Sequence, residues 1–138
     1  IDMGDMLGRV VVPIGPNENA GSLHDRILEG GKILLAKTID DLADGVSQAI
    51  PQSDVISNLH IDILDAHKLF KEDRRVSWLR SAGDLHNHIR GLAPYPGAFT
   101  SLPDAPKAPV KILEAKVDHD HSCELTAGEI SIHEGRLY

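Results

Sequence analysis

The sequence predicts part of an α/β domain, followed by a small β-barrel that includes one helix. The α/β part is predicted by a strand over residues 6–14 with a Val10–Val12 core, and by a long amphipathic helix from Asn19 to about Asp44. The barrel is predicted by short segments joined by turns, at residues 110–117, 129–133 and 136–138. One strand and one helix cannot bury a core. The chain, which opens with Ile-Asp, is therefore expected to be part of a longer protein.

The long helix has clear local signals. Asn19 is a suitable N-cap, and Gly45 is expected to close the helix as its C′ residue. Gly30 and Gly31 lie in its middle, where each costs about 1 kcal/mol relative to alanine. The pair predicts either close packing on a sheet or a kink. Its apolar stripe consists of Leu23, Ile27, Leu34, Ile39 and Leu42.

We expect three parts along the chain: residues 1–46 close an α/β domain, residues 47–68 form a linker, and residues 69–138 begin a second domain. The linker has little sustained periodicity, with a short extended piece expected at His60–Leu64. Trp78, the single tryptophan, is expected to anchor the second core.

Residues 85–100, LHNHIRGLAPYPGAFT, are predicted to form a helix that ends in a sharp corner. Ser81 and Asp84 form a capping signature for this helix. Pro94 and Pro96 cannot continue it, and Gly97 frees the backbone to turn into a strand. A turn containing Pro103, Pro106 and Pro109 should then lead into the strand over residues 110–117. The apolar face of the helix is Leu85, Ile89 and Leu92.

The formal charge of −7 is unevenly distributed along the chain. Residues 1–65 carry four basic and eleven acidic side chains, whereas residues 66–117 carry nine basic and five acidic ones. A basic segment in an acidic protein predicts either a phosphate-binding face or an ordinary solvated surface. The single cysteine, Cys123, suits a reducing cytoplasm. No apolar run approaches the roughly 18–20 residues that span a bilayer, so no membrane partner is expected.

Eight histidines raise the question of a metal site. His119, His121 and Cys123 alternate and could hold zinc, but a solvated loop is the preferred interpretation because a fourth ligand is not evident. His86 and His88 lie about 200° apart on a helix and cannot converge on one metal. We therefore expect no metal.

Four blocks in order resemble the methionyl-tRNA formyltransferase family: IDMGDML, NAGSLHDRIL, AHKLFKEDRRVSW and HIRGLAPYPGAFT. The resemblance implies a Rossmann-like formyltransferase domain, followed by an OB-like barrel that helps to hold tRNA. It implies transfer of a formyl group from 10-formyltetrahydrofolate to the methionyl amino group of initiator tRNA, in the cytoplasm. A monomer is expected.

The resemblance also assigns roles to residues. Asp2 matches the catalytic aspartate of the family, which acts with an Asn and a His that are expected upstream of this chain. The 138-residue chain alone is therefore expected to be inactive. The folate donor is expected to contact one loop, chiefly through its backbone: Ile1, Asp2, Met3, Gly4 and Asp5.

The resemblance makes tRNA the candidate partner of the basic segment, residues 66–117. Arg90 could instead be structural, pinning the corner through hydrogen bonds to carbonyls. Two alternatives stay open: a formyltransferase acting on an aminosugar nucleotide, and a non-catalytic OB module that binds nucleic acid. The candidate phosphate contacts are Arg74, Arg75, Arg80, Arg90, Lys107 and Lys111.

Overall fold

A computed structural model describes residues 4–59, 65–119 and 126–138. The chain divides into two compact units, one formed by residues 1–16 and 22–68 and the other by residues 17–21 and 69–138. We call them unit 1 and unit 2 and describe each by itself. The part of the chain that the structure describes has no helix long and apolar enough to cross a membrane.

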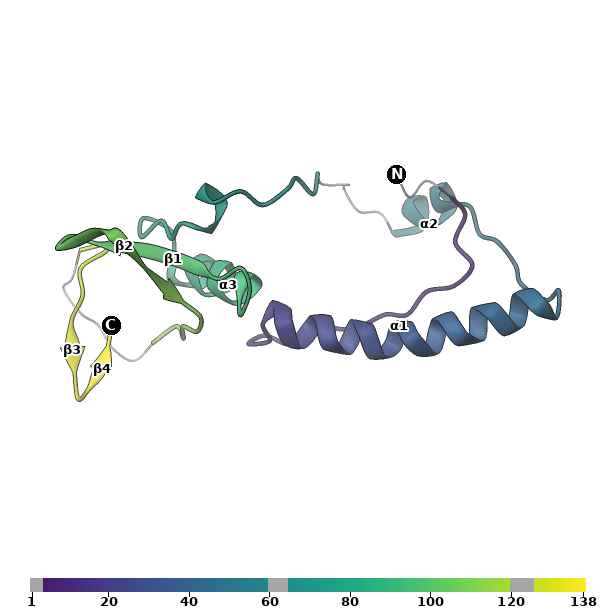
Figure 1. Cartoon of the computed structure of the whole chain (residues 1–138), viewed down its shortest axis with the longest axis horizontal. Coiled ribbons are helices and arrows are strands. Elements are labelled where there is room, and N and C mark those ends of the chain that lie inside the picture. The colour runs from purple at the N-terminus through teal and green to yellow at the C-terminus, as the bar shows by residue number, and fades with distance from the viewer. Residues whose placement is uncertain (1–3, 60–64, 120–125) are drawn as a thin grey trace. The chain divides into compact units, whose positions relative to one another are not determined.

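Unit 1 is built on the long helix α1 (Ala20–Ala43), which is labelled in Figure 1. The first two residues of this helix belong to unit 2. It ends as predicted: Gly45 has φ 68°, its N–H donates to Leu42 O, and the N–H of Val46 donates to Asp41 O. These two bonds form a Schellman motif, which satisfies carbonyls that the helix leaves free. The helix continues through the two glycines, and Gly30 lies against Val10.

The strand expected over residues 6–14 was a wrong prediction, because these residues are described and form no strand. Their backbone makes one antiparallel bridge, in which Met6 and Ile50 exchange hydrogen bonds of 2.8 and 2.9 Å. The segment instead runs beside α1, with Gly8 close to Leu34. A strand needs a hydrogen-bonded neighbour along its length. In the described backbone this segment has such a neighbour at a single residue, Met6.

Residues 47–68, which were predicted to be a linker, contain a helix that their weak periodicity did not predict, α2 (Gln52–Leu59). Pro51 directly precedes it, and a proline there removes no hydrogen bond from the helix. The extended piece expected at His60–Leu64 lies outside the described residues.

Unit 2 contains the buried hydrophobic cluster. It is formed where α3 (Ala82–Leu92) packs against β1 (Ala98–Leu102). Ser81 caps α3 as predicted: its Oγ accepts from the Asp84 N–H at 3.1 Å and donates to the Asp84 carboxylate at 2.7 Å. Gly97, with φ 84°, turns the chain from the corner into β1. The cluster consists of Val76, Ile89, Leu92 and Ala98.

The described strands form two antiparallel pairs. β1 pairs with β2 (Ala105–Ile112), and β3 (Ile132–His133) pairs with β4 (Arg136–Leu137) across the predicted Glu134-Gly135 turn. The prediction of a strand over residues 110–117 was wrong at both ends. An edge strand tolerates proline, because the missing N–H can face away from the partner strand. β2 therefore includes Pro106 and Pro109, and it ends at Ile112.

Trp78 is not a core residue, contrary to prediction. Its side chain is 38% exposed, and its indole N–H donates to Thr100 Oγ1 at 3.0 Å. Gly128, with φ 90°, lies against the Trp78 side chain. A Cβ added at Gly128 would be 3.4 Å from the Cβ of Trp78. The polar N–H favours a position at the surface with a partner, and Val76 fills the core instead.

The N-cap of α3 should carry measurable stability. We expect Ser81→Ala to lower the free energy of unfolding by about 1 kcal/mol, because the Asp84 N–H loses its acceptor. Exposed Ser77→Ala is the matched control and should stay within about 0.5 kcal/mol of the wild type. Chemical denaturation of both variants measures the difference, and equal values would contradict the capping role.

Candidate nucleic-acid interface

Three backbone segments lie side by side at the centre of unit 2. β1 pairs with β2 on one edge, and on its other edge Arg75 forms a parallel bridge with Phe99. The N–H of Val76 donates to Phe99 O at 2.8 Å, which fixes this third segment. The register also pairs Phe99 with Lys111. Residues paired across a sheet share a face, so Arg75, Phe99 and Lys111 form one row.

Phe99 is the centre of this row. Its side chain is 6% exposed, and two guanidinium carbons approach its ring centroid, that of Arg75 at 5.1 Å and that of Arg74 at 5.9 Å. A cation over an aromatic face is attracted by the quadrupole of the ring. The phenyl ring therefore holds two adjacent arginines on one side of β1. We call Arg74, Arg75, Phe99 and Lys111 the cationic row.

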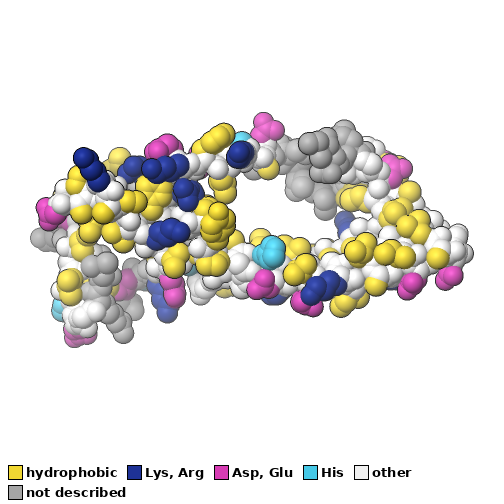
Figure 2. Space-filling view, viewed as in Figure 1, with side chains coloured by type: hydrophobic (Ala, Val, Ile, Leu, Met, Phe, Trp, Pro, Cys, Tyr) yellow, Lys and Arg dark blue, Asp and Glu magenta, His cyan; other side chains and the backbone are white. Residues whose placement is uncertain are grey.

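Polar contacts orient the same two guanidinium groups. Arg74 Nη1 donates to Pro96 O at 3.5 Å, and Arg75 Nη1 donates to Ser101 Oγ at 3.5 Å. Arg75 also meets Glu72 at 3.4 Å, an exposed pair that partly offsets its charge. These contacts are long and leave a positive surface. Figure 2 shows Lys and Arg side chains gathered on the part of the molecule that carries β1 and β2.

The other predicted phosphate contacts differ in their surroundings. Arg80 and Lys107 are exposed, but the structure does not bring them into the cationic row. Arg90 is half-buried on α3, and its guanidinium donates to Asn87 Oδ1 at 2.8 Å and to Glu18 O at 2.9 Å. The sequence raised a structural role for Arg90 but could not name Glu18, which lies 72 residues away.

The predicted donor-binding loop is described only in part. Ile1, Asp2 and Met3 lie outside the described residues, so the structure says nothing of their side chains. Gly4 and Asp5 are exposed, and apart from its own chain neighbours no described residue comes within 4 Å of the Cβ position of Gly4.

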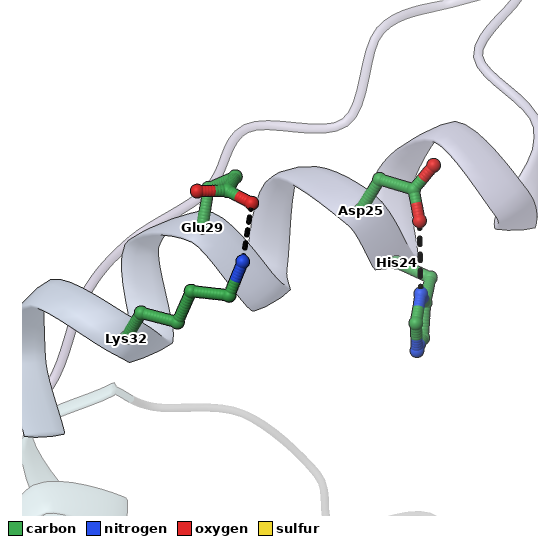
Figure 3. Close-up of polar contacts among 4 residues, drawn as sticks. All are labelled: His24, Asp25, Glu29 and Lys32. Carbon is green, nitrogen blue, oxygen red and sulfur yellow. Dashed lines mark hydrogen bonds and ion pairs between the residues drawn. The ribbon is translucent and has the colours of Figure 1, made fainter.

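The surface of α1 carries acidic and basic side chains in local pairs (Figure 3). His24 meets Asp25 at 3.2 Å, and Lys32 meets Glu29 at 2.7 Å, all strongly exposed. Exposed pairs of this kind contribute less than about 1 kcal/mol. An open hollow of about 390 Å³ lies beside them, lined by Val11, Val12, Pro13, Asp25, Arg26 and Glu29.

Among the described residues, no group of three or more His, Cys, Asp or Glu side chains could hold a metal ion. Of the sequence candidates, His121 and Cys123 lie outside the described residues. One carboxylate has a shifted pKa. A hydrogen bond from the Thr126 N–H, 2.9 Å from Glu129 Oε2, holds the pKa of Glu129 below its ordinary value.

Comparison with known proteins decides the family. The family model described as "Formyl transferase, C-terminal domain" matches residues 68–137, which contain the whole cationic row. The chain belongs to this family. The match covers most of unit 2, so the family's C-terminal domain corresponds to the part of the chain with the buried cluster.

Three similar proteins carry the same name. A "Methionyl-tRNA formyltransferase" of Azobacteroides pseudotrichonymphae is 35% identical over 133 residues, which are 94% of this chain and 40% of that protein. Proteins of the same name from Phocaeicola vulgatus and Halalkalibacterium halodurans are 34% identical over 133 residues and 39% identical over 100 residues. They cover 94% and 72% of this chain, and 40% and 30% of those proteins. The chain thus spans well under half the length of these relatives.

The phenyl ring should contribute to both stability and arginine placement. We expect Phe99→Leu to lower the free energy of unfolding by about 1–2 kcal/mol, through lost cation–π contacts and an imperfectly filled site. Phe70→Leu is the matched control, because Phe70 is 61% exposed. Denaturant titration should show almost no change for the control, and a neutral Phe99→Leu would contradict the role of the ring.

Proposed function

We propose that this chain is part of a methionyl-tRNA formyltransferase, and that the cationic row contacts phosphates of the initiator tRNA. The row carries the proposal, because three cationic side chains gather on one face within the region that matches the family. A contact with an aromatic ring uses the charge of a guanidinium and leaves its in-plane N–H groups able to bind phosphate oxygens. Phosphate contacts position a nucleic acid without reading its sequence.

The proposed reaction moves a formyl group from 10-formyltetrahydrofolate to the methionyl amine. The amine nitrogen forms a bond to the formyl carbon through a tetrahedral oxyanion, and the bond from that carbon to N10 of the folate breaks. One amine proton is removed and the released folate nitrogen gains one, so atoms and charge balance. Asp2 is proposed to assist this proton transfer, with the loop Ile1–Asp5 contacting the donor. The proposed architecture is a Rossmann-like domain followed by an OB-like barrel.

The acceptor distinguishes this proposal from its alternatives. Formyl transfer by the full-length protein should be measured onto methionyl-tRNA and onto a UDP- or TDP-linked aminosugar. We expect product with methionyl-tRNA, because a polyanion suits the cationic row better than one sugar nucleotide does. Transfer to the aminosugar alone would replace the proposed acceptor. Binding of tRNA without any transfer would favour a nucleic-acid-binding module.

Neutralising the cationic row should reduce the salt dependence of tRNA binding. In the full-length protein, Arg75→Gln with Lys111→Gln should weaken binding and lower the slope of log K against log salt. The expected decrease is about 0.7–0.9 per lost phosphate contact. The matched control removes two charges from α1, by Lys32→Gln with Lys37→Gln. If both double variants have the same slope, the cationic row is not the tRNA surface.

Removing the carboxylate beside the cationic row should strengthen tRNA binding, whereas neutralising the row should weaken it. Glu72 lies 3.4 Å from Arg75, so Glu72→Gln should strengthen tRNA binding by about twofold at low salt. Glu29→Gln, which breaks an equivalent exposed pair with Lys32, is the control and should leave affinity unchanged. A titration at two salt concentrations measures both variants. Weaker binding by Glu72→Gln would mean that the carboxylate itself contacts the acceptor.

A further inference from the structure

A short segment before and at the start of α1 belongs to unit 2. This segment, Asn17–Gly21, is here called the anchor segment. Two hydrogen bonds tie it to the helix–corner motif: the Gly21 N–H donates to Ala93 O at 3.1 Å, and Arg90 Nη1 donates to Glu18 O at 2.9 Å. Ala93 is 2% exposed, so the first bond forms away from solvent. The anchor segment is thus held at two points, three residues apart.

Gly21 is required by close approach rather than by its backbone angle. A Cβ at this position would lie 2.5 Å from Pro94 Cδ, a separation that side chains do not tolerate. The absence of a side chain therefore lets the start of α1 reach the corner and donate its N–H to Ala93. Gly31, in the same helix, has no described atom within 4 Å of its Cβ position apart from its chain neighbours and the backbone of its own helix. The two glycines offer a matched comparison within one helix.

Arg90 is held on its own helix as well as by the anchor segment. Its Nε donates to Asn87 Oδ1 at 2.8 Å, three residues earlier on α3, and this bond orients the planar guanidinium toward Glu18. The side chain is half-buried, unlike exposed Arg75. Donors that already meet a carbonyl and an amide oxygen would have to release them before binding a phosphate. Arg90 therefore differs in its surroundings from Arg75 of the cationic row.

We propose that Arg90 is a positioning residue, which fixes the anchor segment on the corner and does not contact tRNA phosphates. This inference rests on the proposed function. α1 starts inside the anchor segment and continues in unit 1, so Arg90 acts where the chain passes from one unit to the other. Loosening this attachment within unit 2 should lower the rate of formyl transfer, while phosphate contacts made elsewhere persist. Small misplacements of reacting groups can lower rates by as much as about a hundredfold.

The test uses Arg90→Met, Gly21→Ala and the control Gly31→Ala in the full-length protein. We expect kcat for formyl transfer to fall about tenfold in the first two variants. The salt slope of tRNA binding should stay at the wild-type value in all three. Amide hydrogen exchange at position 21 should accelerate in Arg90→Met and Gly21→Ala, because both loosen the anchor segment. Arg90→Lys, which can still donate to Glu18 O, should retain more activity than Arg90→Met.

The opposite pattern would overturn the inference. If Arg90→Met lowers the salt slope by about 0.7–0.9 and leaves exchange at position 21 unchanged, Arg90 is a phosphate contact. Wild-type kcat in both Gly21→Ala and Arg90→Met would also contradict a positioning role. If the wild-type protein transfers no formyl group, the proposed function fails, and amide exchange alone then decides whether Arg90 holds the anchor segment.

Discussion

Unit 2 depends on the close packing of β1 against α3 at Ala98, whose side chain has no exposed surface. A methyl group there lets Ile89 and Leu92 approach the strand, which they could not do over a larger residue. Because side chains alternate along a strand, Phe99 points to the opposite face from Ala98. The helix covers one face of β1, and arginine side chains lie over Phe99 on the other. The cationic row is therefore a consequence of how the core is built.

Several parts of this arrangement were predictable because their signals are local. Ser81 caps α3 by accepting the N–H of Asp84, three residues further along the chain, and Gly45 closes α1 with a left-handed backbone that favours glycine. The corner likewise follows from prolines and Gly97 within a few residues. In each case the residues that interact are neighbours in sequence. The physical preference of the residue then decides the structure without help from distant segments.

The failed predictions concern contacts between segments far apart in sequence. Val10 and Val11 have a strand composition, yet composition does not supply a hydrogen-bonded neighbour, and both side chains are exposed. Trp78 was predicted to be a core residue because of its size, but its indole N–H donates to Thr100 Oγ1 at the surface. The arrangement of the cationic row around Phe99 could not be predicted either, although its basic members were candidates from their charge. Lys111 was a candidate from charge alone, and only the register of β1 and β2 places it beside Phe99.

The arginines of unit 2 show why charge in a sequence does not assign a role. Arg75 and Arg90 carry the same group, and both lie in blocks that resemble the same family. Arg75 lies over a phenyl ring and makes longer polar contacts, at 3.4 Å with Glu72 and 3.5 Å with Ser101 Oγ. Arg90 donates at 2.8 and 2.9 Å to oxygens of the protein itself. A phosphate would complete the first arrangement and would have to break the second. In the proposed function, the shorter bonds of Arg90 to the protein's own oxygens, more than its positive charge, distinguish it from Arg75.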